Sequence, residues 1–506
     1  MMKKKLINSA LWVLILMLCV SIQSNAENNK SGLENSSSVT GLGLQGNDNA
    51  IQPYHENPWY WQYKGKPIML IGGSDNDNLF QWTGDRLTDH LDLLRSVGGN
   101  YVRNTMSDRD KKGSAFAVDE GDAFAAREVK DGMYDLEQWN EEYWNRLEFF
   151  LDETAQRDII VQLTLWDRFD FNSNHPYHPD NNVNWESGTI ENANDFYRLS
   201  VIENNEPVLD YQHRYIDKLM SITLNYDHIL YNIKNESSAE TAQLNYWAHY
   251  IQKAAASQNK KIYITSMRLI PGNSLRHVMT NRDIYSFADV SQNNQNAAGA
   301  VGYGHYENLL YWRNMIEAQR QGPMPINNEK LYGAGEAENR AAGTGLEAVE
   351  RFWRNIFGGA ASTRFHRPDN NWGIGLSEQA QSTIKAASMF LEEFDLFNSK
   401  PYAGCETIGN KISAAYCLAS VGNAYAVYFP DGFSTVALDP WVYTDEVTVK
   451  WLNITNGVWG QEETLTLDWS EIPWWGPDRV LYITPGGFAD AGGIRRSSHI
   501  AIIKPK

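Results

Sequence analysis

Cysteine is scarce in this chain, with three residues among 506. Cys19 lies in an apolar run near the N-terminus, so only Cys405 and Cys417 remain for the rest of the protein. Two cysteines 12 residues apart do not have the spacing of a zinc site. In an oxidising compartment they either form a disulfide or stay as two buried thiols, and the sequence leaves both alternatives open.

Long apolar runs are also missing beyond the N-terminal region, which excludes a later membrane span. The first 26 residues combine a basic start at Lys3–Lys5, a short apolar stretch at Leu11–Val20 and small residues at Ser24–Ala26. This is the pattern of a secretory signal peptide. Leu18 is too bulky for the position before a lipidated Cys19. We therefore expect residues 1–26 to be cleaved and the mature protein to be secreted or periplasmic.

Positive charge is in the minority, with 44 Lys and Arg against 62 Asp and Glu. The signal holds three lysines and no acidic residue, so its removal takes the net charge from −18 to −21. Such a surface repels phosphate, and the chain has no basic tract, so we expect no nucleic-acid partner. The charge says little about a sugar substrate, and nothing in the sequence indicates the oligomeric state.

Several catalytic motifs are absent. The chain has no H-E-x-x-H zinc motif, no phosphate-binding P-loop and no G-x-S-x-G nucleophile elbow. The segment GLGLQG at 41–46 matches a dinucleotide-binding fingerprint, but no strand precedes it and no helix follows it. We therefore expect neither a metal nor a cofactor.

The region 51–400, which follows a polar leader at 27–50, alternates apolar strand-like runs with amphipathic helical segments. This alternation predicts an α/β fold, a (β/α)8 TIM barrel, with a doubly wound open sheet as the alternative, since periodicity does not reveal closure. Helices are predicted at 85–99, 143–156, 241–256, 345–359 and 379–397. The predicted strands are 67–73, 100–106, 158–166, 228–236, 261–267, 287–293, 324–329 and 360–366.

The pattern changes near residue 400 to short alternating segments separated by Pro, Gly and Asp turns. Residues 401–506 are therefore predicted to form a small C-terminal β-sandwich that contributes no catalytic group.

Two Asn-Glu pairs end predicted strands of the barrel. Asn235-Glu236 ends the fourth strand and Asn328-Glu329 ends the seventh. In a parallel barrel the active site lies at the C-terminal ends of the strands, and these two strands stand roughly across its mouth from each other. Hydrolysis of a glycosidic bond needs two carboxyl groups that flank the bond. The pairs therefore point to a glycoside hydrolase acting on a poly- or oligosaccharide.

The segment YNIKNESS at 231–238 resembles the acid/base strand of the clan of retaining (β/α)8 glycoside hydrolases. Over about 58–506 the chain resembles the apiosidase-like branch of that clan, through PIMLIGGSD (67–75), GGAASTRFHRP (358–368) and GIGLS (373–377). The C-terminal segments AYAVYFPDG (424–432) and VTVKWLNITNG (447–457) resemble a module named for collagen binding, which that branch carries.

The resemblance implies roles for three residues. Glu236 would be the acid/base, Glu329 the nucleophile, and Asn235 would bind the sugar 2-hydroxyl. Glu336 and Glu338 follow closely and are alternatives to Glu329 as nucleophile. A retaining pair has carboxyl groups about 5–5.5 Å apart. At that distance we expect one of them, Glu236, to keep its proton.

Other strand ends offer further substrate contacts. Arg103 either pairs with the nucleophile and holds it ionised, or forms a structural salt bridge. Trp372, in a polar segment, is the best candidate for an aromatic platform beneath a sugar. Asp75 and Asp77 follow strand one. The remaining candidates lie at or after the ends of strands two, three, six and eight: Asn104, Trp166, Asp167, Asn294, Tyr303, His305, His366 and Arg367.

Two other functions compete with the glycosidase hypothesis. A polysaccharide lyase acting on a uronic-acid polymer would use Tyr303, His305 and Arg103, but it would leave both glutamates unexplained. A non-catalytic carbohydrate-binding protein is favoured by the terminal sandwich, but a degenerate barrel would be expected to lack one of the glutamates. The sequence does not name the sugar, its linkage, or endo against exo action.

Overall fold

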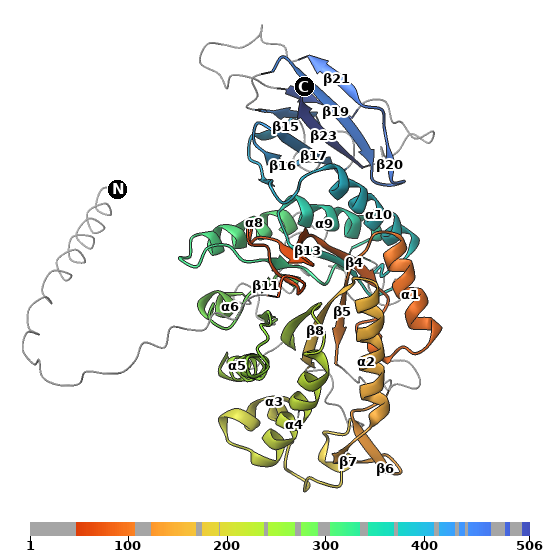
Figure 1. Cartoon of the computed structure of the whole chain (residues 1–506), viewed down its shortest axis with the longest axis vertical. Helices are drawn as coiled ribbons and strands as arrows, with labels where there is room; N and C mark the ends of the chain where they lie inside the picture. The colour runs from red at the N-terminus through yellow and green to blue at the C-terminus, as the bar shows by residue number, and fades with distance from the viewer. Residues whose placement is uncertain are drawn as a thin grey trace, which may run out of the picture. The chain divides into compact units, whose positions relative to one another are not determined.

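The chain is a mixed α/β protein. In the computed structural model, drawn in Figure 1, one compact unit spans Gln45–Lys506. No helix in the described ranges is long and apolar enough to cross a bilayer. The residues that the structure describes are 47–106, 123–167, 175–191, 193–236, 241–268, 275–291, 304–333, 343–368, 373–408, 414–430, 435–440, 444–466, 481–485 and 498–506.

Parallel strands occur at all eight predicted positions. Six of them form one sheet in the order β10-β9-β8-β5-β4-β13, and the other two, β11 and β12, pair with each other. Within the six-stranded sheet the parallel strands from β4 to β10 follow their order in the chain, and β13 lies beside β4, but the two sheets do not form one closed barrel. Their bounds are β4 (Leu70–Ser74), β5 (Tyr101–Thr105), β8 (Ile160–Asp167), β9 (Ile229–Asn235), β10 (Ile264–Thr265), β11 (Ala288–Asp289), β12 (Ile326–Asn327) and β13 (Ser362–His366).

The eight strands are not assigned to one continuous sheet, but backbone hydrogen bonds cross both gaps. The amide of Ser286, before β11, donates to the carbonyl of Ile264 in β10 at 2.9 Å. The amide of Ala361, before β13, donates to Ile326 in β12 at 2.7 Å. Each gap between the six-stranded and two-stranded sheets is therefore bridged by main-chain contact.

A layer of buried polar side chains links the two parallel sheets. Gln162 of β8 donates to Asp289 of β11 at 2.7 Å and accepts from Asn327 of β12 at 2.9 Å. Tyr101 of β5 also donates to Gln162, and Trp61 donates to Asn327. Because buried polar groups need partners, this network fixes the strands that carry the site relative to one another.

Helices follow most of these strands in the chain, as Figure 1 shows. Helix α1 buries Leu87, Leu91 and Leu94, which the sequence predicted to share a face. Helix α9 begins with a capping box in which Thr344 and Glu347 bond each other's backbone. The bounds are α1 (Asp85–Ser96), α2 (Glu141–Gln156), α3 (Ala193–Ile202), α4 (Glu206–Thr223), α5 (Thr241–Ser257), α6 (Arg276–Thr280), α8 (Gly304–Glu317), α9 (Gly345–Phe357) and α10 (Glu378–Glu393), with 3-10 turns at η1 (Leu79–Gln81) and η2 (Pro179–Asn181).

Two antiparallel units were not predicted. The first is the sheet β1 (Gln52–Pro53), β2 (Trp61–Tyr63) and β3 (Lys66–Ile68), and the second is the hairpin β6 (Ala126–Lys130) and β7 (Met133–Trp139). Both hairpins turn on two residues with positive φ, Lys64-Gly65 and Asp131-Gly132, which is the geometry of a tight type I′ turn. The predicted strand 67–73 is therefore split between β3 and β4.

The C-terminal region forms two antiparallel sheets. A seven-stranded sheet has the order β14-β16-β17-β23-β19-β20, with β21 also paired to β19, and a three-stranded sheet has the order β15-β18-β22. One apolar cluster takes side chains from both, including Val427 and Phe429 from the larger and Val436 and Ile483 from the smaller. The bounds are β14 (Lys400–Pro401), β15 (Cys405–Ile408), β16 (Tyr416–Ser420), β17 (Ala424–Phe429), β18 (Thr435–Leu438), β19 (Glu446–Asn453), β20 (Val458–Trp459), β21 (Glu463–Thr466), β22 (Leu481–Ile483) and β23 (His499–Pro505).

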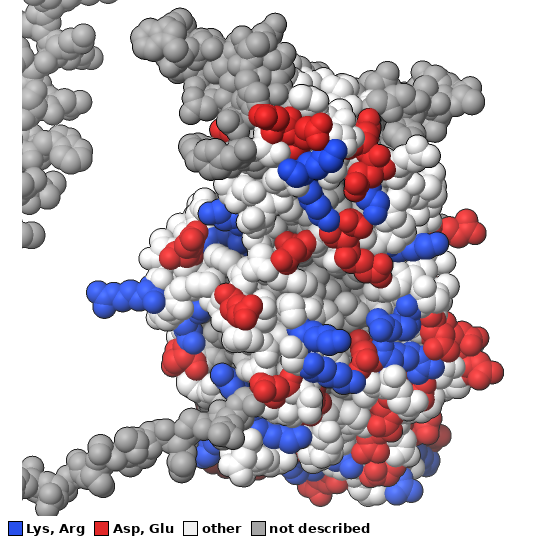
Figure 2. Space-filling view, turned by 45° about the horizontal axis from the view of Figure 1, so that its top comes forward, with Lys and Arg blue, Asp and Glu red and all other residues white. Residues whose placement is uncertain are grey.

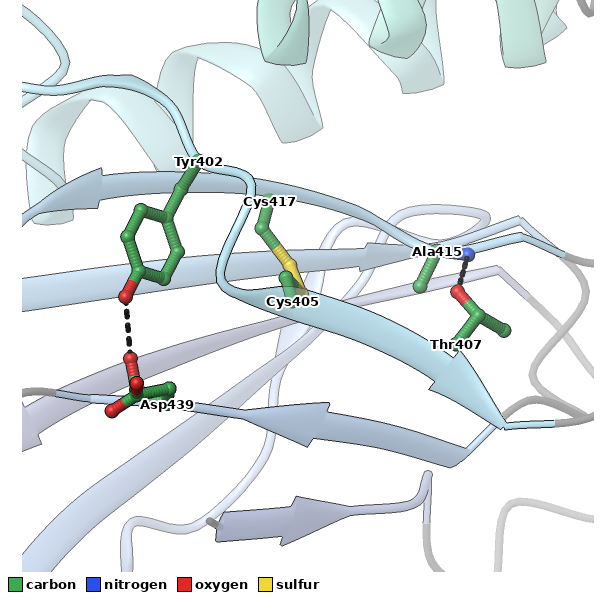
Figure 3. Close-up of a disulfide and its surroundings, with 6 residues drawn as sticks. All are labelled: Tyr402, Cys405, Thr407, Ala415, Cys417 and Asp439. Atoms are coloured by element: carbon green, nitrogen blue, oxygen red, sulfur yellow. Dashed lines mark hydrogen bonds between the residues drawn. A yellow bond between two sulfur atoms is a disulfide. The ribbon is translucent and has the colours of Figure 1, made fainter. Parts of the chain in front are cut away.

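A disulfide joins Cys405 and Cys417, which answers the question that the sequence left open. Cys405 lies on β15 of the smaller sheet and Cys417 on β16 of the larger one, so the bond ties the two sheets together (Figure 3). The neighbouring Thr407 accepts a hydrogen bond from the amide of Ala415 at 3.0 Å.

The C-terminal sheets contact the helices through both apolar and charged groups. The ring of Trp353 on α9 lies 6.1 Å from that of Tyr428 on β17. Glu393, the last residue of α10, accepts from both Lys450 and Lys504 at 2.9 Å. On the face shown in Figure 2, acidic and basic side chains are interspersed.

Candidate active site

Glu329 follows β12 at the C-terminal end of the parallel strands. Its amide donates to the hydroxyl of Ser291 at 2.8 Å, and its carbonyl accepts from Arg364 of β13 at 2.7 Å. The neighbouring elements therefore fix the backbone of Glu329 from both sides.

Arg103 of β5 forms an ion pair with Glu329, which is one of the two alternatives that the sequence left open. Its Nε lies 2.8 Å from Oε1 of Glu329, and neither side chain is exposed. Burial raises the pKa of Glu329 to about 8, although Arg103 beside it favours the charged form. Arg103 therefore contacts the candidate nucleophile as the sequence suggested, while burial opposes the ionised form that Arg103 was expected to maintain.

Glu236 follows β9 directly and faces a second cation. Its Oε1 accepts from Nζ of Lys330 at 2.8 Å. The backbone of Glu236 has φ of 46°, a left-handed conformation that costs a non-glycine residue roughly 1–3 kcal/mol. Such strain is found where the surrounding structure imposes a conformation, and functional sites are a frequent location for it.

Asn235 lies between the two glutamates in the hydrogen-bond network. Its Oδ1 accepts from Nη2 of Arg103 at 3.0 Å and from Nζ of Lys330 at 2.7 Å. Its Nδ2 donates to Asp167 of β8 at 3.0 Å. The amide is therefore held in one orientation, and Arg103 and Lys330 connect the carboxyl groups of both glutamates through it.

Asp77, which follows β4, holds the other side of Arg103. Its Oδ1 lies 2.9 Å from Nη1 of Arg103 and 3.0 Å from Nδ1 of His366, and its Oδ2 accepts from Nε of Arg367 at 2.7 Å. Burial opposes the charge of Asp77, but Arg367, His366 and Arg103 together hold its pKa well below the usual range. Asp77 is therefore the anion that positions Arg103 toward Glu329.

The structure brings several of the predicted residues into this network. It joins Arg103 to Asn235 and Glu329 directly, Glu236 to Asn235 through Lys330, Asp167 through Asn235, and His366 through Asp77. Between the two glutamates it adds Lys330, which the sequence reading missed.

Three other predicted residues are placed elsewhere. Asn104 follows Arg103 in β5 and accepts from the amide of Phe80 at 3.0 Å. Trp166 packs against Phe196, Tyr215 and Trp247 from the helices. His305 is buried in the first turn of α8. Trp372 lies outside the described residues, as do Asn294, Tyr303, Glu336 and Glu338.

The signal for Lys330 in the sequence was weak, namely its position directly after Glu329. Lys330 is a lysine beside the last residues of an apolar strand, and lysine is almost never fully buried unless it is paired. Its side chain is 1% exposed. Burial lowers the pKa of Lys330, and the charge of Glu236 acts against that shift.

The arrangement suits acid-base and nucleophilic chemistry by two carboxyl groups. The described residues contain no group of three or more His, Cys, Asp or Glu placed to hold a metal ion. Two carboxyl groups, each in contact with a cation and linked through Arg103, Asn235 and Lys330, can take different protonation states. That is the requirement for a pair in which one member donates a proton while the other acts as a base or nucleophile.

Comparison with known proteins shows the fold. No protein-family model matches the chain, and no curated protein matches its sequence. Among solved structures it is similar to a glycoside hydrolase family 5 protein from Bacteroides vulgatus, with a TM-score of 0.59 and 12% identity, over 90% of this chain and 94% of that one. A structure named only as a glycoside hydrolase has a TM-score of 0.60 and 12% identity, over 91% of this chain and 97% of the other. The chain therefore shares its fold with these proteins.

Proposed function

We propose that this protein is a glycoside hydrolase that cleaves a poly- or oligosaccharide by a retaining mechanism with Glu236 and Glu329. The observation that carries the proposal is the pair of glutamates that follow β9 and β12, linked through Arg103, Asn235 and Lys330. Both glutamates lie at the strand ends where parallel barrels hold their active sites. The names of the structural neighbours agree with this chemistry.

In the proposed first step, a carboxylate oxygen of Glu329 attacks the anomeric carbon and the glycosidic bond breaks. Glu236 gives its proton to the leaving oxygen. In the second step Glu236 takes a proton from water, whose oxygen attacks the anomeric carbon and releases Glu329. We propose that the second hydrogen on Nδ2 of Asn235 donates to the sugar 2-hydroxyl, since Asp167 accepts the first.

The proton has to start on Glu236, yet the resting site favours the opposite arrangement. Burial favours a protonated Glu329, and the ammonium of Lys330 stabilises negative charge on Glu236. Each arrangement holds one proton, on Glu329 in the resting form and on Glu236 in the reactive form. The two forms therefore differ only in where that proton lies. We propose that the sugar, by bringing its leaving oxygen to Glu236, favours the reactive form.

The finer assignments are also proposals. We propose that the eight parallel strands close into a (β/α)8 barrel, supported by the two backbone bonds across the gaps. We propose that residues 401–506 form a β-sandwich, supported by the apolar cluster between the two sheets. Membership in the apiosidase-like branch, with its collagen-binding-type module, rests on the sequence resemblance, and export rests on the N-terminal pattern.

The decisive experiment is to screen the purified mature protein against plant and algal polysaccharides and a panel of 4-nitrophenyl glycosides. Nuclear magnetic resonance would then follow the anomeric configuration of the first product. We expect hydrolysis with retention. An inverted product would overturn the mechanism, and an unsaturated uronic-acid product would identify a lyase. Absence of any turnover, with Glu236→Gln and Glu329→Gln binding the same sugars as the wild type, would overturn the catalytic function.

A further inference from the structure

Lys330 is the buried cation that contacts the proposed acid/base. Its Nζ lies 2.8 Å from Oε1 of Glu236 and 2.7 Å from Oδ1 of Asn235, both at the end of β9. The lysine itself comes from the segment after β12 and directly follows Glu329. Two consecutive residues of that segment therefore provide one carboxyl group of the pair and the cation that contacts the other.

We propose that Lys330 is a positioning residue that fixes the Glu236 carboxylate and the Asn235 amide in one orientation and sets the pH range of the reaction. This inference rests on the proposed function, because it assigns Lys330 a role in the same site. Lys330 touches neither of the reacting bonds. It acts through Glu236.

Other charged and titratable groups face the pair from each neighbouring strand. Arg103 of β5 shares Oδ1 of Asn235 with Lys330, and Asp167 of β8 binds the other end of that amide. Asp289 of β11 and Arg364 of β13 lie near Glu329, and Tyr332 lies near Glu236. Lys330 contacts Oε1 of Glu236 directly, in an ion pair of 2.8 Å.

The contact between Lys330 and Glu236 predicts the direction in which the pH profile moves when the lysine is replaced. A positive charge near a carboxyl group favours its ionised form, and Lys330 acts in this way on both Glu236 and Glu329. Without that charge both groups keep their protons to higher pH. The reaction needs one protonated and one ionised carboxyl group, so both limbs of its bell-shaped pH profile should move upward together. A residue that only supports the fold would lower activity and leave the profile in place.

The test compares Lys330→Met, Lys330→Gln and Lys330→Arg with the wild type. The probes are the 4-nitrophenyl glycoside that the wild type cleaves fastest and the 2,4-dinitrophenyl glycoside of the same sugar. For the uncharged variants we expect both limbs of kcat/KM against pH to rise by about one unit. We expect about a 10- to 100-fold loss of kcat on the first probe and a smaller loss on the second, whose leaving group needs little acid assistance. Lys330→Arg should keep the wild-type profile.

Lys450→Met is the matched control, since it removes a lysine–glutamate contact of 2.9 Å at the C-terminal sheets. Its profile should equal that of the wild type. An unshifted profile in both Lys330→Met and Lys330→Gln would overturn the inference. If Glu236→Gln and Glu329→Gln kept full activity, the proposed function itself would be wrong.

A measurement that does not depend on turnover tests the inference in variants that are inactive. The titration of Lys330 can be followed by the 13Cε chemical shift in protein produced with 13C-labelled lysine, with Lys330→Met used to identify the signal. Because the charge of Glu236 raises the pKa of Lys330, Glu236→Gln should move this titration to lower pH. An unchanged titration would show that the contact does not couple the two groups and would overturn the inference.

Discussion

Arg103 and Glu329 form an ion pair in which neither side chain is exposed to solvent, with Nε of the arginine 2.8 Å from Oε1 of the glutamate. The same guanidinium donates to Asn235 and lies 2.9 Å from Asp77. One arginine on β5 therefore contacts residues from three other strand ends. A buried guanidinium with this set of partners positions the groups around it, because moving any one of them would leave a buried N–H group without its partner.

Glu329→Gln should abolish turnover and keep the fold. The amide is nearly the same size and its oxygen can still accept from Arg103, but it is not a nucleophile. We expect kcat to fall by at least about 10³-fold. Circular dichroism and the melting temperature would verify the fold. Retained activity in this variant would move the nucleophile to Glu336 or Glu338, and Glu336→Gln and Glu338→Gln are the matching controls.

Glu236→Ala should separate proton donation from nucleophilic attack. Loss of the acid should cost about 10²–10⁴-fold on natural sugars and much less on a 2,4-dinitrophenyl glycoside. Added azide should restore turnover by attacking the covalent intermediate, giving a glycosyl azide of retained configuration. In a Glu329→Ala variant azide would replace the nucleophile and give the inverted product. The same configuration from both variants would contradict the assigned roles.

Much of the framework could be predicted from the sequence because it depends on local patterns. Apolar runs with helical segments between them located all eight parallel strands to within a few residues. Alternation likewise indicated that the region after residue 400 consists of short strands. The hairpins around Lys64-Gly65 and Asp131-Gly132 were missed because the first turn precedes the first predicted strand, 67–73, and the second lies between the predicted strand 100–106 and the predicted helix 143–156.

The partners of the site residues depend on contacts between distant segments. Arg103 and Glu329 are far apart in the sequence. Only their places at the ends of the second and seventh predicted strands suggested that they lie close together. Lys330 escaped notice because a lysine at a strand end ordinarily points to water. The charge balance also escaped prediction, since the pKa of Glu329 depends on complete burial, which no sequence pattern reveals.

The disulfide should stabilise the C-terminal sheets. Because Cys405 and Cys417 lie on different sheets and close a short loop, we expect Cys405→Ala/Cys417→Ala to lose about 2–4 kcal/mol of unfolding free energy. Urea unfolding would measure the loss. A reducing agent should destabilise the wild type and leave the double variant unchanged. The active site uses neither cysteine, so kcat below the unfolding transition should stay the same.

The protonation of Glu329 should appear in the pH dependence of stability. Burial raises its pKa from an ordinary 4.5 to about 8, so between these pH values the folded protein holds a proton that the unfolded chain has lost. The stabilisation that this proton gives is complete below pH 4.5 and decreases as pH rises to 8, by up to about 1.4 kcal/mol per pH unit. Glu329→Gln removes the group, so its unfolding free energy relative to the wild type should increase steadily from pH 5 to pH 8.

The contrasting variant is Glu393→Gln, because hydrogen bonds from Lys504 and Lys450 lower the pKa of Glu393. The contribution of Glu393 is present above its ordinary pKa and is lost only in acid, so its difference curve should be flat over the same range. Urea unfolding at intervals of half a pH unit would measure both curves. A flat curve for Glu329→Gln would show that Arg103 keeps Glu329 ionised in the resting protein after all.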